Sequence, residues 1–197
     1  MWRIAALAVW LCAATPLAAQ WSVGAEVGML GFGGTSIDTS TPNDPPRLRP
    51  SPSTTYGVRV QRRFGKVGLG IGGLYSKGGV GAENGSVAVE QKGMLRLYEV
   101  APEASLLVAR PGPGGAFRLH LGPLIDWWSP SGAPHRTRVG VRAAVSLDWP
   151  LAGRWTGTFG AGVALSSSVL LSEEVPAGYV LRAMWHRALS AGIEMRL

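Results

Sequence analysis

The sequence predicts an all-β fold, namely an eight-stranded antiparallel up-and-down transmembrane β-barrel. Three observations lead to this prediction. Many short segments alternate between apolar and polar residues with a period of two. The connections between them are alternately short and long, as in outer-membrane barrels. Charged residues gather on one face of the segments, while the other face is apolar. The length of 197 residues fits one such domain.

The first residues, MWRIAALAVWLCAATPLAAQ, have the pattern of a secretory signal peptide. Arg3 provides a short basic region, an apolar run follows from Ile4 to about Thr15, and small residues precede a cleavage site after Ala19. The apolar run is shorter than the roughly 20 residues that a spanning helix needs. We therefore expect residues 1–19 to be a signal peptide and residues 20–197 to be the barrel domain.

The composition limits the classes of partner. Cys12 is the only cysteine and lies within the expected signal peptide, so we expect no disulfide in the mature chain. The formal net charge is +7, but no Lys/Arg cluster is interleaved with aromatic residues. We therefore expect no nucleic acid partner, and anionic lipid headgroups suit the basic charge better.

Each of the first four strands has alternate apolar positions. The segments run from Trp21 to Phe32, Thr54 to Phe64, Val67 to Lys77 and Lys92 to Ala109. Their apolar positions include Val23 and Val27, Val58 and Val60, Leu69 and Ile71, and Leu106 and Val108. This spacing places the apolar side chains of each strand on one face.

The last four strands follow the same pattern. They run from Ala116 to Trp128, Arg138 to Pro150, Trp155 to Leu170 and Tyr179 to Leu197. The clearest of them is RVGVRAAVSLDWP, in which Val139, Val141, Val145, Leu147 and Trp149 occupy alternate positions. The connections GK, RPGPGG and LAGR are short, whereas the other four are longer and all fall at one end of the meander. We expect these four to be extracellular loops.

The charged face predicts a polar lumen, because ions enclosed in a narrow barrel must be paired. Arginine suits such pairing, since its planar fork can bridge carboxylates. The predicted lumenal ion-pair cluster has six acids and six arginines: Glu26, Arg59, Arg63, Glu99, Glu103, Arg118, Asp126, Arg138, Arg142, Asp148, Glu194 and Arg196. Inward glycines would leave room for the arginines: Gly68, Gly70, Gly72, Gly140, Gly160, Gly162 and Gly192.

Aromatic residues near the strand ends predict two girdles at the bilayer interfaces. The short-turn girdle comprises Trp21, Phe64, Phe117, Trp149 and Trp155, and the long-loop girdle comprises Tyr56, Tyr75, Trp127 and Tyr179. The aromatic core of a soluble sandwich would instead lie towards the strand middles.

The segment LYEVAPEASLLVA, from Leu97 to Ala109, resembles the strand with a Glu followed shortly by Pro in many small eight-stranded outer-membrane barrels. This family includes the transmembrane domain of OmpA and the OmpX proteins. The resemblance implies a monomeric barrel in the bacterial outer membrane, inserted by the barrel-assembly machinery. The final segment ALSAGIEMRL departs from the family pattern, since it ends in Leu197 rather than Phe or Trp.

The sequence contains no clear motif for a catalytic or metal site. An acyl hydrolase needs a serine beside a histidine that a carboxylate orients, and His186 would need Ser166 or Ser167 from an adjacent strand. His120 and His186 lack the spacing of metal ligands, so we interpret them as lumenal packing residues. We expect no catalytic residue, no metal and no cofactor.

The long loops and their rims could contact partners. Arg47 and Arg49 lie in a Pro-rich first loop that we expect to be mobile. Basic residues near this end could meet lipopolysaccharide phosphates: Lys77, Lys92, Arg96, Arg136 and Arg187.

The function expected from these features is a non-enzymatic structural or surface-interaction role in the outer membrane. The alternatives are a narrow gated pore and a soluble, lipocalin-like periplasmic barrel that binds a lipophilic ligand. The soluble barrel would need an apolar interior, so the alternatives predict opposite faces for Arg118 and Leu119.

Overall fold

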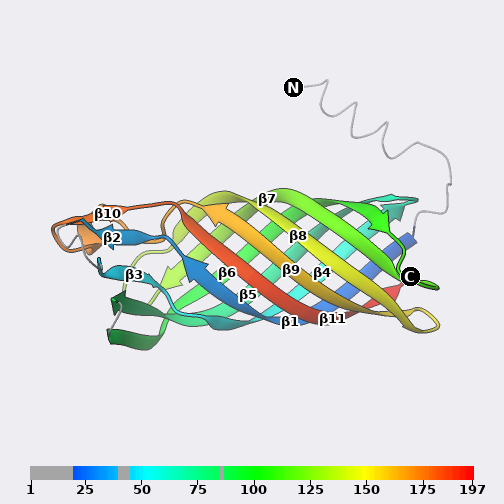
Figure 1. Ribbon diagram of the computed structural model, residues 1–197, viewed down its shortest axis with the longest axis horizontal. Coiled ribbons are helices and arrows are strands. Elements are labelled where there is room, and N and C mark those ends of the chain that lie inside the picture. Colours follow the sequence, from blue (N-terminus) through cyan, green and yellow to red (C-terminus); the bar gives the residue numbers. More distant parts are fainter. Residues whose placement is uncertain (1–19, 40–44, 85–86) are drawn as a thin grey trace, which may run out of the picture.

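The computed structural model describes residues 20–39, 45–84 and 87–197, which form a closed antiparallel barrel of eight strands (Figure 1). The predicted signal peptide, residues 1–19, lies outside the described residues. The wall is built by β1 (Gln20–Gly33), β4 (Ser53–Phe64), β5 (Val67–Asn84), β6 (Val87–Ala109), β7 (Ala116–Pro130), β8 (Arg136–Ala152), β9 (Trp155–Ser166) and β11 (Met184–Arg196). Pairing of β1 with β11 closes it. The predicted fold class is confirmed.

Short turns join the wall strands at one end, where the described chain also begins and ends. Gly65 and Gly153 each occupy the first position of a two-residue turn, with φ of 62° and 54°. Glycine adopts this left-handed conformation without steric cost, and a glycine here suits the hairpin turns that match strand twist. This end is called the short-turn end below.

The opposite end, called the mouth end, has more strand than the sequence predicted. β5 and β6 continue beyond the wall as a hairpin, and β2 (Ser36–Asp38), β3 (Arg47–Pro50) and β10 (Tyr179–Leu181) add to it (Figure 1). The Pro-rich first connection was expected to be a mobile loop. Instead its RLRP segment pairs with β5, and the SID segment pairs with β10.

Two strand predictions were wrong in their bounds for the same reason. β9 ends at Ser166 rather than Leu170, and the predicted last strand is divided into β10 and β11. Between β9 and β11 the chain leaves the wall, forms the short 3-10 helix η1 (Ser172–Glu174), and pairs β10 with β2. Pairing outside the wall satisfies backbone groups that the wall itself does not reach.

The wall has an apolar outside and a polar inside over most of its length. Val141 and Leu119 are 58% and 45% exposed on the outer face, whereas Arg118, next to Leu119, is 5% exposed. This arrangement is opposite to that of a soluble sheet with a hydrophobic core. No helix among the described residues is long and apolar enough to cross a membrane.

Candidate functional site

The most distinctive site is the barrel interior, which every wall strand lines with alternate residues. Near the short-turn end, Arg63 of β4 contacts both Glu194 and Asp148 through Nη2, at 2.7 Å and 3.4 Å respectively. Arg118 Nε lies 3.3 Å from Asp148 Oδ2, and the Gln61 amide donates to Glu194. Four strands are thus joined by one ionic network: β4, β7, β8 and β11.

A second network lies next along the axis. Arg59 Nε contacts Glu103 Oε1 at 3.1 Å, and Arg59 Nη2 lies 3.8 Å from Glu26 Oε1. His120 Nδ1 pairs with Glu103 Oε1 at 3.2 Å, and Ser190 donates to Glu26 at 3.0 Å. These contacts join β1, β4, β6, β7 and β11 across the lumen.

Ser146 links the two networks. Its hydroxyl lies 3.0 Å from His120 Nε2 and 3.2 Å from Asp148 Oδ1. A continuous series of polar contacts therefore runs from Glu194 to Glu26. Because the members come from different strands, their pairing fixes how the strands are placed around the barrel.

Ser146, His120 and Glu103 have the order of nucleophile, base and orienting carboxylate that acyl hydrolases use. All three side chains are buried, and the adjoining cavity measures about 10 Å³. That volume holds one water molecule, which leaves no room for an acyl substrate. The three side chains connect the two ionic networks.

The serines considered for His186 occupy other positions. In the register of β9 and β11, Ser166 lies opposite Met184 rather than His186. Its hydroxyl hydrogen-bonds the Ser167 carbonyl at 3.5 Å. The serine, histidine and carboxylate that do come together were not selected from the sequence. Counting residues from the short turn between β6 and β7 would not have found this group, because the register shifts between Leu107 and Ala109 before Ser105 comes to lie opposite His120.

A third group of ionizable residues lies closer to the mouth end. Arg142 Nη1 contacts Glu99 Oε1 at 3.1 Å. Asp126 lies directly opposite Glu99 in the register of β6 and β7, and is fully buried. His186 of β11 completes the group, with a ligand atom within 4.8 Å of atoms from both carboxylates.

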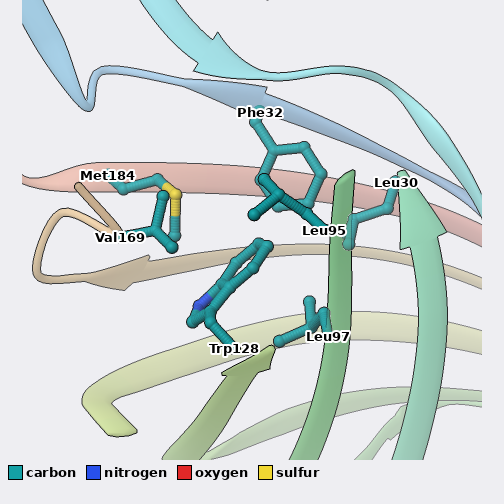
Figure 2. Close-up of a cluster of buried hydrophobic side chains, with 7 residues drawn as sticks. All are labelled: Leu30, Phe32, Leu95, Leu97, Trp128, Val169 and Met184. Atoms are coloured by element: carbon teal, nitrogen blue, oxygen red, sulfur yellow. The ribbon is translucent and has the colours of Figure 1, made fainter. Parts of the chain in front are cut away.

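The mouth itself is filled by apolar side chains, which the sequence did not predict (Figure 2). Phe32 packs edge-on against Trp128, with ring centroids 5.6 Å apart and an interplanar angle of 60°. The cluster consists of Leu30, Phe32, Leu95, Leu97, Trp128, Val169 and Met184. Buried apolar area of this kind stabilises the fold without ion pairing.

Val169 enters the mouth from the connection after β9. Arg136 Nη1 donates to the Val169 carbonyl at 2.7 Å, and Arg138 Nε donates to the Ser168 carbonyl at 2.6 Å. Arg136 also pairs with Glu174. The segment 167–175, called the strap below, is therefore held over the mouth by two arginines of β8.

Glu174 is the residue of the strap whose carboxyl pKa is changed by these contacts. Burial alone would raise the pKa of its carboxyl group. The hydrogen bonds from the Leu171 N–H and from Arg136 outweigh burial, so the pKa is lowered from its ordinary value. The ionised form is the one that these donors stabilise.

The remaining residues of the predicted cluster have other surroundings. Arg138 donates to the strap as described, and Arg196 is half-buried at the short-turn end. Neither has a salt bridge to an acidic group within the part of the chain that the structure describes.

The predicted girdle residues are distributed over both ends. At the short-turn end Trp21, Trp149 and Trp155 are exposed, while Phe64 and Phe117 are half-buried. At the mouth end Tyr56 and Trp127 are exposed and Tyr75 is half-buried. Tyr179 lies in β10, outside the eight wall strands. Two further aromatic residues that the prediction missed are exposed near the mouth end, Tyr98 and Trp185.

The inward glycines make room mainly for neighbours other than arginine. A Cβ on Gly192 would meet the Ala25 carbonyl at 2.4 Å and Glu26 Cβ at 2.9 Å. A Cβ on Gly68 would meet Ser105 Oγ at 2.5 Å. Gly72 differs, because its nearest neighbour would be 3.9 Å away.

Comparisons with known proteins show the fold. The sequence matches no protein-family model and no curated protein. Neisserial surface protein A (NspA) is similar with a TM-score of 0.59 and 11% identity, over 90% of this chain and 97% of that chain. The outer membrane protein OprG from Pseudomonas aeruginosa is similar with a TM-score of 0.57 and 9% identity, over 91% and 96%. The chain has the fold of the small eight-stranded outer-membrane barrels, as its resemblance to them predicted.

Proposed function

We propose that the protein is an integral barrel of the bacterial outer membrane with a structural or surface-interaction role and no catalytic site. The apolar outer wall is the observation that supports this most strongly. Val27, Val58, Leu121, Val141 and Leu189, from five different strands, are each at least 50% exposed. In water such a wall would be an unusually large apolar patch, whereas lipid chains solvate it.

The same face assignment argues against a soluble lipocalin-like barrel. That alternative requires an apolar interior that encloses a ligand. Here Arg118 is buried beside Asp148, and Leu119 faces outward. The mouth cluster is apolar, but its side chains pack against each other.

A narrow gated pore has less support. The ionic networks cross the lumen, and the cavities beside His120 and His186 measure about 10 Å³ each. Conduction would require the Glu99–Arg142 contact and the mouth cluster to rearrange together. We expect no steady conductance in planar bilayers from the wild type or from Arg142→Ala, and sustained single-channel currents would support the pore instead.

Lipopolysaccharide is the partner that the mouth-end rim supports. Lys77 and Arg96 lie directly opposite each other on β5 and β6, and both are exposed. They adjoin the Tyr75–Tyr98 ring pair, whose centroids are 5.1 Å apart. Like charges at opposed positions destabilise a sheet unless an anion lies between them, and lipid phosphates can supply it. Arg136 is less suited, because it is buried against the strap.

Two experiments test this proposal. On fractionation, the protein should remain in the outer-membrane pellet, and its electrophoretic mobility should change on boiling. Recovery in the soluble periplasmic extract would contradict the membrane assignment. For the partner, Lys77→Gln with Arg96→Gln should remove the extra stability gained in vesicles that contain lipopolysaccharide, whereas Arg110→Gln at the short-turn end should keep it. Equal effects of both changes would refute the partner site.

A further inference from the structure

We propose that Glu99, Asp126 and His186 bind one divalent transition-metal ion of the zinc class inside the barrel. The proposal depends on the closed barrel and its lumen, and it stands whether or not the surface-interaction role is correct. It also replaces the interpretation of His186 as a packing residue.

The geometry brings three potential ligand residues close together. Glu99 and Asp126 are inward neighbours on β6 and β7, and His186 reaches them from β11. One ligand atom from each residue lies within 4.8 Å of the others, and all three residues are buried. Three ligands on separate strands of a rigid wall form a preformed site rather than a flexible surface cluster.

The unsatisfied atoms point to an occupant. Asp126 is 0% exposed and His186 is 3% exposed. Nε2 of His186 has no hydrogen-bond partner within the described parts of the chain. Neither oxygen of Asp126 has a partner at hydrogen-bond geometry there, and Ser166 is the one side chain that acts on this carboxylate as a donor. Unpaired polar atoms are costly in such a buried position. A cation bound between them would satisfy all three atoms at once.

The local charge also favours a cation. Two carboxylates directly opposite each other on neighbouring strands repel. Arg142 contacts Glu99 at 3.1 Å and supplies one positive charge. When both carboxylates are ionised and His186 is neutral, the group with Arg142 carries one net negative charge, which a bound cation would neutralise. Glu99 keeps acceptor capacity beyond this contact, because a carboxylate has about four lone-pair sites.

The ligand set selects the class of metal. An imidazole nitrogen with carboxylate oxygens is typical of zinc and related ions, whereas magnesium and calcium prefer oxygen ligands alone. The adjoining cavity, about 10 Å³ and lined in part by Glu99, Arg142 and His186, has room for one ion or one water molecule.

The mouth cluster covers the three ligand residues on the side that faces the mouth end. Phe32 stacks on the His186 ring, with centroids 5.7 Å apart and an interplanar angle of 23°. This contact fixes the plane of the imidazole. Phe32 also packs against Trp128, so the apolar cluster shields the three ligands from the mouth-end solvent. An apolar shell of this kind strengthens the interaction between an ion and its ligands.

His120 provides an internal control. It is equally buried at 3% exposed, and it also lies beside a carboxylate, but both of its nitrogens have partners, Glu103 and Ser146. If any buried lumenal histidine bound metal, His120 and His186 would be equivalent. Our proposal requires that of these two histidines only His186 contribute to metal binding.

The test uses the full chain extracted from membranes in detergent, stripped with a chelator, and titrated by calorimetry with Zn²⁺ alone and with Mg²⁺ alone. Co²⁺ is then added as a spectroscopic substitute for zinc. We expect one Zn²⁺ per chain, weaker binding of Mg²⁺, and visible Co²⁺ bands from a nitrogen and oxygen ligand set. No stoichiometric Zn²⁺ binding would overturn the proposal and leave water or a proton between the carboxylates.

Variants locate the ion. Asp126→Asn and His186→Gln should each weaken Zn²⁺ binding by more than about tenfold, since even loss of an outer-shell partner costs that much. His120→Gln should leave binding unchanged. Each variant is first shown to be folded by its mobility before and after boiling, and the two ligand variants give independent readings if one does not fold. Equal loss in His120→Gln, or full binding in both ligand variants, would refute the site.

Discussion

The short-turn half of the lumen and the mouth are enclosed by the same eight strands, but they are filled in opposite ways. The short-turn half contains the series of contacts from Glu194 to Glu26, while the mouth contains Phe32, Trp128 and their apolar neighbours. The comparison shows that a barrel of this width does not dictate a polar interior. The barrel requires only that each enclosed side chain be either apolar or, if it is polar, paired with a partner.

The two halves should therefore respond differently to substitution. Removing one member of an ionic network leaves another charge unpaired, and charges cannot relax by repacking. Removing part of an apolar side chain leaves a cavity that neighbours can partly fill. The predictions below test this difference, beginning with the largest expected effect.

Asp148→Ala should cause the largest loss of stability. Asp148 accepts contacts from Arg63, Arg118 and Ser146, so its removal leaves two buried guanidinium groups without this partner. We expect a loss of about 3–5 kcal/mol in the free energy of unfolding, measured by urea titration in lipid vesicles. Arg196→Gln is the control, because Arg196 has no salt bridge among the described residues, and it should cost less than about 1 kcal/mol. Equal effects would show that the network contributes little.

Leu97→Ala tests the mouth. Leu97 is 1% exposed in the apolar cluster, and its truncation should cost about 3 kcal/mol, within the range for buried leucine. Leu106→Ala, on the outer face of the same strand, should cost less than Leu97→Ala, because it loses lipid contact but leaves no enclosed cavity. A negligible loss for Leu97→Ala under the same urea titration would mean that the mouth cluster is not tightly packed.

Gly192→Ala tests the space around Glu26. The added Cβ would lie 2.4 Å from the Ala25 carbonyl, and such overpacking typically costs about 1–3 kcal/mol. Gly72→Ala should be nearly neutral, because its Cβ would have no neighbour closer than 3.9 Å. If both changes cost the same in thermal unfolding, crowding in the lumen would not be the cause of the loss at Gly192.

The smallest effect is expected at the strap. The pKa of Glu174 is lowered in the folded protein, so its contribution is present above the unfolded-state pKa and is lost as the pH falls through the folded value. Hydrogen exchange in residues 167–175 should be faster in Glu174→Gln than in the wild type at pH 7. The difference corresponds to about 1 kcal/mol or less. It should begin to fall near the ordinary glutamate pKa of about 4.3 and be gone only below the lowered pKa of the folded protein. A difference that persists at lower pH would exclude the Arg136–Glu174 pair as its cause.

The sequence was sufficient for the wall, because period-two alternation and alternating connection lengths are local signals. Val141 and Arg142 were assigned to opposite faces on this basis, and the structure places Val141 outside and Arg142 in contact with Glu99. Strands outside the wall gave no such signal. The RLRP segment becomes β3 only because β5 extends far enough to pair with it.

The interior was harder to predict because its contacts depend on register across several strands. The sequence identified charged positions, but not that Asp126 would lie opposite Glu99 or that Ser146 would reach His120. The apolar mouth was missed for another reason. Leu97 and Trp128 lie on the inward face, where the alternation alone gave no reason to distinguish a packed apolar cluster from a polar lumen.

The outward orientation of the apolar face can be measured directly at Val141. In a Cys12→Ala background, Val141→Cys is labelled with a fluorophore, and the barrel is reconstituted in vesicles containing lipids with brominated acyl chains. We expect strong quenching by the brominated chains and little quenching by iodide in the buffer. Strong quenching by iodide with none from the brominated lipids would show that this face meets water, and would contradict the membrane-spanning barrel.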